Sequence, residues 1–133
     1  MTTVRGAVWL GVVALAGVAV YAALVVLPYF VNGLDRFPLA DVAIGHHDPK
    51  DLWPATVPYV GGWLHLFGVL SMAFAPATLV CVAFASGFAS VWAGTRRAWS
   101  VTAAHTAVVL GCVAAAAWFV TPFAEALAGW QLD

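Results

Sequence analysis

Charged residues are scarce in this 133-residue chain: five basic and six acidic side chains make up 8% of it. Soluble proteins carry about 25%. Three long stretches have no charge at all: residues 6–34, 52–95 and 98–124. An ionised side chain at the centre of a bilayer costs at least about 2.5–3.5 kcal/mol, and about 20 apolar residues cross ~30 Å of hydrocarbon as a helix. The scarcity of charge excludes a soluble fold and predicts three membrane crossings.

Residues and motifs that most catalysts and transporters need are also missing. No Asp, Glu, Lys or Arg falls inside a predicted crossing, which argues against an ion pump, a charge-coupled transporter or a voltage sensor. The chain has no nucleophile elbow, zinc-protease helix, phosphate-binding loop or CxxC pair. With a net charge of −1 and no basic run, it also has no basic surface on which to bind nucleic acid. We therefore expect a protein that is not an enzyme.

The two cysteines offer little redox chemistry. Cys81 and Cys112 both fall inside predicted crossings. We interpret them as buried free thiols that pack as small apolar groups.

Helix-breaking residues bound the predicted helices. The crossings are expected over residues 7–30, 61–94 and 99–120, which predicts an all-α membrane fold with a single three-helix domain, residues 1–133. The second stretch would extend about 51 Å as a straight helix. A bend at Pro76 or a tilt is the expected way to absorb the excess, and a re-entrant hairpin turning at Pro76 is a less favoured alternative.

The remaining segments are a loop and a tail. Residues 32–60 read as a polar loop, since four prolines exclude a long helix: Pro38, Pro49, Pro54 and Pro58. Within the loop, Asp48 is a plausible N-cap with Pro49 at the first helical position, and Pro54 limits that helix to about one turn. Residues 121–133 form an interfacial tail, expected to rest on the membrane surface through Phe123, Leu127 and Trp130.

The basic residues predict the orientation. Arg5, Arg96 and Arg97 would lie in the cytoplasm, leaving Arg36 and Lys50 outside. The N-terminus is then cytoplasmic, while the loop and the C-terminus are extracytoplasmic. Ile, Asn and Lys each occur once. Because their codons are AT-rich, we infer a high-GC bacterial gene and a multi-pass protein of the bacterial inner (plasma) membrane.

Small residues recur at every fourth position of the third crossing, which lets another helix backbone approach closely. We call this set the small-residue ridge: Ala103, Ala107, Gly111 and Ala115. The second crossing has a shorter equivalent that includes Ala85 and Ala89. The ridges either meet each other within the chain or receive a helix from another chain. Both readings stay open, because three helices cannot hide every face.

His105 is the only ionisable side chain well inside a crossing. The favoured interpretation is a neutral imidazole that hydrogen-bonds to Ser86 or Ser90, at a similar depth on the second crossing. The alternatives are a haem or metal ligand and a proton carrier.

His46, His47 and Asp48 form the densest cluster of potential metal ligands. Adjacent side chains usually point apart, and no third well-spaced His or Cys completes a tetrahedral site. A capped, solvated loop is therefore the favoured reading, with loose copper or zinc binding as the alternative.

Together these features predict a non-catalytic accessory or assembly subunit that packs beside larger integral membrane subunits. A bacterial respiratory or transport complex would suit it. The expected partners are other membrane subunits, as a homo- or hetero-oligomer, and the lipid bilayer. No cofactor is expected in this reading. The alternatives are a haem- or metal-binding membrane anchor of a redox complex, with His105 as ligand, and a small oligomeric transporter.

Overall fold

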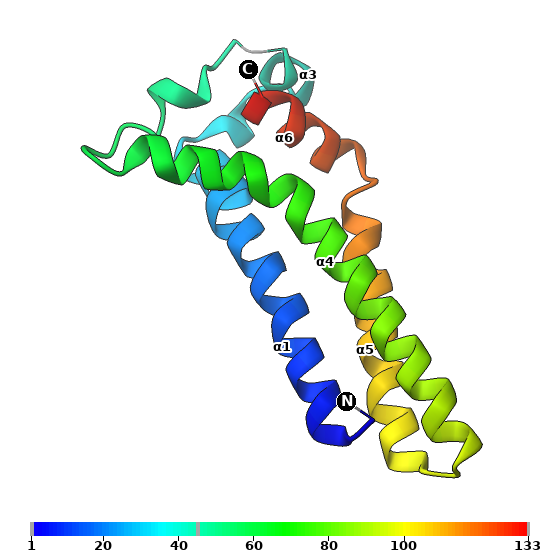
Figure 1. Ribbon diagram of the computed structural model, residues 1–133. Helices are drawn as coiled ribbons and strands as arrows, with labels where there is room; N and C mark the ends of the chain where they lie inside the picture. The colour runs from blue at the N-terminus through cyan, green and yellow to red at the C-terminus, as the bar shows by residue number, and fades with distance from the viewer. Residues whose placement is uncertain (1, 45, 133) are drawn as a thin grey trace. The chain divides into compact units, whose positions relative to one another are not determined.

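The computed structural model describes residues 2–44 and 46–132, and all regular structure in these residues is helical (Figure 1). This confirms the predicted all-α class. The elements follow one another as α1 (Val4–Tyr21), the π-helical turn η1 (Ala22–Val26), α2 (Leu27–Val31), the 3₁₀ turn η2 (Leu34–Arg36), α3 (Leu39–Ala43), the 3₁₀ turn η3 (Pro49–Asp51), α4 (Gly61–Thr95), α5 (Trp99–Trp118) and α6 (Pro122–Leu132).

Three helical segments are long and apolar enough to cross a membrane: Val4–Val31, Gly61–Thr95 and Trp99–Trp118. They correspond to the three predicted crossings, and the third ends two residues earlier than expected. α4 is unbroken through Pro76, so the re-entrant hairpin considered at that residue is not formed. The structure is that of a membrane protein with three candidate spans.

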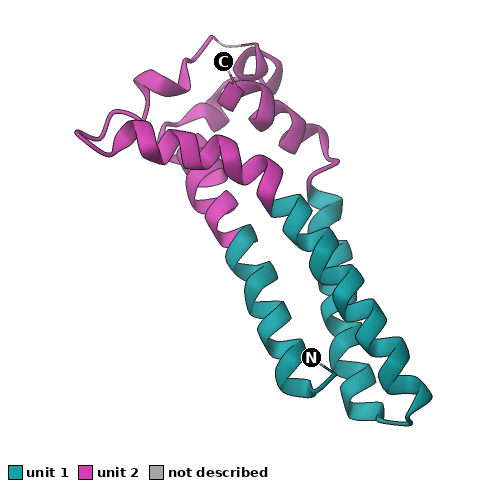
Figure 2. Cartoon of the chain, viewed as in Figure 1, with its two compact units in different colours: residues 1–18, 75–118 teal, residues 19–74, 119–133 magenta. Residues whose placement is uncertain are grey.

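The chain divides into two compact units (Figure 2). Unit 1 comprises residues 1–18 and 75–118, and unit 2 comprises residues 19–74 and 119–133. α1 and α4 each contribute to both.

Unit 1 is held together by a regular seam along α4. The buried positions are four and three residues apart in alternation, the spacing of helices packed side by side: Ala75, Leu79, Val82, Ser86, Ala89 and Ala93. From α5, His105 and Cys112 are buried. Ser90 links the two helices, because its Oγ lies 2.8 Å from Thr106 Oγ1 and donates to the Thr102 carbonyl at 3.3 Å.

Unit 2 buries the C-terminal helix. Leu127 and Trp130 of α6 are 0% and 1% exposed, so the expectation that these two residues rest on the membrane surface is wrong. The physical reason is that the loop supplies them with protein partners. α6 packs on α3, whose Val42 is fully buried, and Trp130 Nε1 donates to the His47 carbonyl at 2.8 Å. Phe123 instead forms a T-shaped pair with Tyr29, with ring centroids 5.2 Å apart.

The loop between the first two spans contains the short helix that its sequence predicts. η3 begins after Asp48, whose carboxylate accepts from the Lys50 backbone N–H at 2.8 Å, and Pro49 takes the first helical position. The side chain of Asn32 then fixes the loop to the end of α2. Its Nδ2 donates to the carbonyls of Pro28 at 2.8 Å and Trp53 at 2.7 Å, and its Oδ1 accepts from Trp53 N–H at 3.2 Å.

A π-helical turn interrupts the first span just before Pro28. In an α-helix the Leu24 carbonyl would accept from the N–H of residue 28, but proline has none. Gln131 of α6 replaces it, donating from Nε2 to the Leu24 carbonyl at 3.2 Å. Gly68 of α4 lies against the same carbonyl, since a Cβ at this glycine would be 3.0 Å from it. The first span, α4 and α6 thus meet at the Leu24 carbonyl, which lacks a donor at Pro28.

Candidate functional site

An open apolar groove of about 250 Å³ runs between α1 and α5 in unit 1. Its floor and walls are small or aliphatic: Gly11, Ala14, Leu15, Val18, Leu79, Val108, Gly111, Cys112 and Ala115. Apart from the buried thiol of Cys112, this lining has no group for acid–base, nucleophilic or ionic chemistry. It is suited to receiving another apolar shape, such as a helix.

Two members of the small-residue ridge of α5, Gly111 and Ala115, line this groove. Ala103, Ala107 and Gly111 are exposed, and Ala115 is half-buried. A Cβ placed on Gly111 would meet nothing within 4 Å. Most of the ridge is thus uncovered by the chain itself, which favours the second of the two readings, a helix from another chain.

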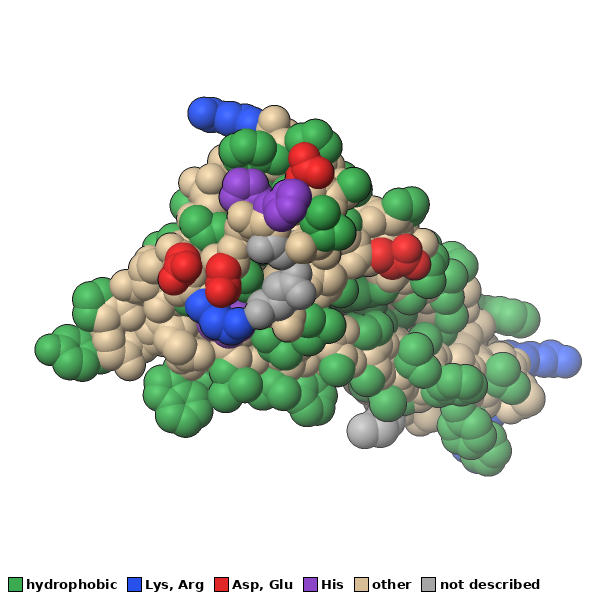
Figure 3. All heavy atoms as spheres, turned by 90° about the horizontal axis from the view of Figure 1, so that it is seen from above, with side chains coloured by type: hydrophobic (Ala, Val, Ile, Leu, Met, Phe, Trp, Pro, Cys, Tyr) green, Lys and Arg blue, Asp and Glu red, His purple; other side chains and the backbone are tan. Residues whose placement is uncertain are grey.

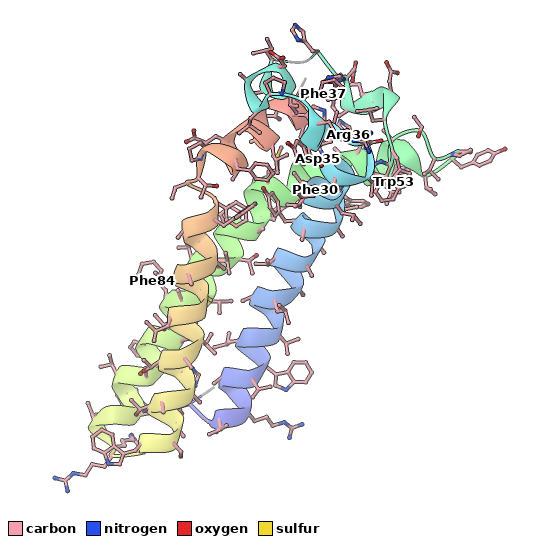
Figure 4. All side chains as sticks on the ribbon, turned by 180° about the vertical axis from the view of Figure 1, so that it is seen from behind. Phe30, Asp35, Arg36, Phe37, Trp53 and Phe84 are labelled. Carbon is pink, nitrogen blue, oxygen red and sulfur yellow. The ribbon has the colours of Figure 1, made fainter. Side chains whose placement is uncertain are left out.

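The second ridge is split between the interior and the surface. Ala89 belongs to the buried seam of α4, while Ala85 is exposed. Near Ala85 the outer face of α4 carries bulky rings, since Phe84 is 77% exposed and projects away from the helix (Figure 4), and Phe88 is 73% exposed. α4 therefore presents large side chains outward where α5 presents small ones.

Sequence reasoning missed the small residues of the first span. Gly11 approaches Val108 of α5, since a Cβ there would lie 3.7 Å from its Cγ2, and Gly17 comes equally close to Thr78 of α4. Ala7 and Ala14 are buried on the same side of α1. The signal was present in the sequence, because Ala7, Gly11 and Ala14 have the alternating four-three spacing of the α4 seam.

His105 lies at 0% exposure in the interior of unit 1, as does Ser86. The expected hydrogen bond between them is not formed, because Ser86 Oγ has no hydrogen-bond partner among the described residues. Ser90, the other expected partner, is engaged with Thr106 and Thr102. The groove is not lined by His105. Packed protein around the imidazole suits a structural role better than ligation of a haem, and both readings remain predictions.

Metal binding by His46, His47 and Asp48 of the loop stays a prediction. In the described part of the chain no three His, Cys, Asp or Glu side chains are grouped so as to hold a metal ion. His47 packs its ring on Phe37, with centroids 4.5 Å apart, and Asp48 caps η3. Figure 3 shows histidine, acidic and basic side chains interspersed with hydrophobic ones on the face seen from above.

The cysteines are both free thiols, as expected, but only Cys112 is buried. Cys81 is exposed on the outer face of α4, because it falls between the seam positions Leu79 and Val82.

Compared with protein-family models, curated proteins and solved structures, the chain matches none of them.

Proposed function

We propose that this chain is a non-catalytic integral membrane subunit that packs against other membrane subunits in a bacterial inner-membrane complex. An accessory or assembly role, for example in a respiratory complex, suits its small size and lack of catalytic groups. The observation that carries the proposal is the open ridge at Gly111 beside the apolar groove. A surface where a helix backbone can approach closely favours association in lipid, where the hydrophobic effect does not drive helices together.

The poor coverage of the three spans supports the same proposal. In the most apolar stretch of each span only 17%, 28% and 11% of residues are buried, in chain order. The least covered is α5, which carries the ridge. In this proposal the groove and ridge receive a helix of the partner, while the remaining apolar surface faces lipid.

The proposed orientation has the N-terminus in the cytoplasm. Residues 32–60 then form an extracytoplasmic segment with α6 packed onto it, and Arg96 and Arg97 lie at the cytoplasmic turn between α4 and α5.

Replacing Gly111 by Leu tests the proposal, because it adds bulk to the ridge at a position where a Cβ would meet nothing within 4 Å. The tagged protein would be purified from its native membrane in a gentle detergent and the co-purifying chains identified. We expect the Gly111→Leu protein to keep its abundance but lose its partner. Ala117→Leu is the matched control, since it adds similar bulk at an exposed α5 position outside the groove. Equal recovery of the same partners by Gly111→Leu and the native chain would contradict the proposal.

A further inference from the structure

The length of α5, and the level at which it contacts α4, indicate how many residues of α4 fit within the bilayer. α5 has 20 residues and, at 1.5 Å per residue, is about 30 Å long, which matches the hydrocarbon thickness. The contacts of Ser90 with Thr102 and Thr106 set which residues of the two helices are level. The two helices run in opposite directions. Counting equal numbers of residues from this contact, forward along α5 and backward along α4, brings Trp118, the end of α5, level with about Pro76. Leu79 and Ala115, which line one groove, agree with this register.

The first part of α4, Gly61–Phe74, therefore lies outside the hydrocarbon, with Phe74 at the hydrocarbon boundary. If it continued straight, it would run about 20 Å into headgroups and water. Pro76 stands at this junction and removes the backbone hydrogen bond to the Met72 carbonyl, which permits a change of direction.

Nevertheless, this part of α4 exposes a large apolar face. Trp63, Leu66, Phe67, Leu70 and Phe74 are between 39% and 64% exposed. These positions repeat at helical spacing, and no charged residue occurs from Leu52 to Thr95. The opposite side is covered by unit 2 itself, through Gly68 at the Leu24 carbonyl and the buried Ser71. One face is thus occupied by protein and the other lacks a partner.

We propose that Gly61–Phe74 lies along the membrane surface with this face in the lipid at the headgroup–acyl boundary, and that only Ala75–Thr95 crosses the hydrocarbon. Ala75–Thr95 has about the length of α5 and matches the bilayer equally well. Lipid is the occupant because the same helix goes on to the exposed residues Val80, Cys81 and Phe84, which face lipid in the proposed function, on which this inference rests. The face has no charged side chain to select a protein partner, and its one polar group is the indole N–H of Trp63. Trp, Phe and Leu are typical of interfacial helices.

Spin-label depth measurements test this placement in the full chain. Cys81 and Cys112 would be replaced by Ala, and single cysteines introduced at Leu66, Leu70 and Ala73, all exposed. The labelled proteins would be reconstituted in vesicles of phosphatidylcholine and phosphatidylglycerol, and depth read from collisions with oxygen and with a water-soluble nickel chelate. We expect the three sites to report one shallow depth. Labels at Val80, Phe84 and Val91 are the matched controls, whose depth should change by about 1.5 Å per residue.

Two results would overturn the proposal. A steady change of about 10 Å between Leu66 and Ala73 would show that this part of α4 crosses the bilayer. Full access of the nickel chelate to all three sites, with the controls still in lipid, would show that the face lies in water and is free for a protein partner.

Discussion

The side chain of Gln131 donates a hydrogen bond to the backbone carbonyl of Leu24, 107 positions earlier in the chain, at 3.2 Å. Gln131 is the only glutamine in the sequence, and it is 3% exposed. Its amide replaces the N–H that Pro28 lacks, so the C-terminal helix completes the hydrogen bonding of the first span.

Gln131→Leu should loosen α6, because it roughly keeps the side-chain volume but removes the donor to the partly buried Leu24 carbonyl. The expected cost is about 1 kcal/mol, equivalent to a roughly fivefold faster hydrogen exchange of the α6 amides. Loss of Oε1 adds no cost, since this atom has no hydrogen-bond partner among the described residues. Leu132→Ala, at a 67% exposed neighbour, should leave exchange nearly unchanged. Identical exchange in both variants would mean that the bond contributes nothing.

Gly68→Ala and Gly62→Ala should have opposite effects on stability. Ala is favoured over Gly within a helix by about 0.5–1 kcal/mol. At Gly62 nothing lies within 4 Å of the new Cβ, so this gain should appear as a higher unfolding temperature in detergent. At Gly68 the Cβ would sit 3.0 Å from the Leu24 carbonyl oxygen, so the helices must separate and the unfolding temperature should fall. A rise for both variants would show that the two segments are not packed this closely.

Asn32→Ala should free the loop between the first two spans. The substitution removes two donated hydrogen bonds and one accepted bond. Two of the three join Asn32, at the end of α2, to the backbone of Trp53 in the loop. We expect faster cleavage of residues 32–60 by limited proteolysis, with a stability loss of about 1–2 kcal/mol. Asn32→Asp keeps the acceptor for Trp53 N–H but turns a carboxylate oxygen toward the Pro28 and Trp53 carbonyls, so it should not restore the native cleavage rate. An unchanged cleavage rate for Asn32→Ala would contradict a role for this side chain.

Cysteine labelling of intact cells should report the proposed orientation. In the background lacking Cys81 and Cys112, a cysteine at Thr56 should react with a membrane-impermeant maleimide, and one at Thr95 should react only after the membrane is opened. Both positions are exposed in the structure, so reactivity depends on the side of the membrane. The reverse pattern would place the N-terminus outside.

The sequence was sufficient for the helices themselves. The charge-free stretches predicted three spans, Asn32-Gly33 marked the end of the first, and Asp48-Pro49 marked the start of η3. These features depend on local chemistry, namely the cost of buried charge, the left-handed φ of Gly33 at 69° and the capping carboxylate. They need no knowledge of what packs against the helix.

Tertiary partners were harder to predict. The spans are apolar all round, so hydrophobicity does not distinguish a buried face from a lipid-facing one. The ridge at Gly111 was found by its every-fourth spacing, but the alternating four-three spacing of Ala7, Gly11 and Ala14 in the first span was not recognised. Leu127 and Trp130 fit a membrane surface as well as a protein interior, and only the position of α3 decides between them.

The seam of α4 recurs every seven residues, which favours a gentle left-handed supercoil with α5. The seam has two positions: Ala75, Val82 and Ala89 occupy one, and Leu79, Ser86 and Ala93 occupy the other. A slip of α5 along α4 by one repeat would meet similar small residues at the first position, but at the second it would exchange Leu79 for Ser86. It would also separate the hydroxyl groups of Ser90 and Thr106, now 2.8 Å apart. Size at one seam position and the contacts of Ser90 thus both set the register of the pair, and with it the residues that face the groove.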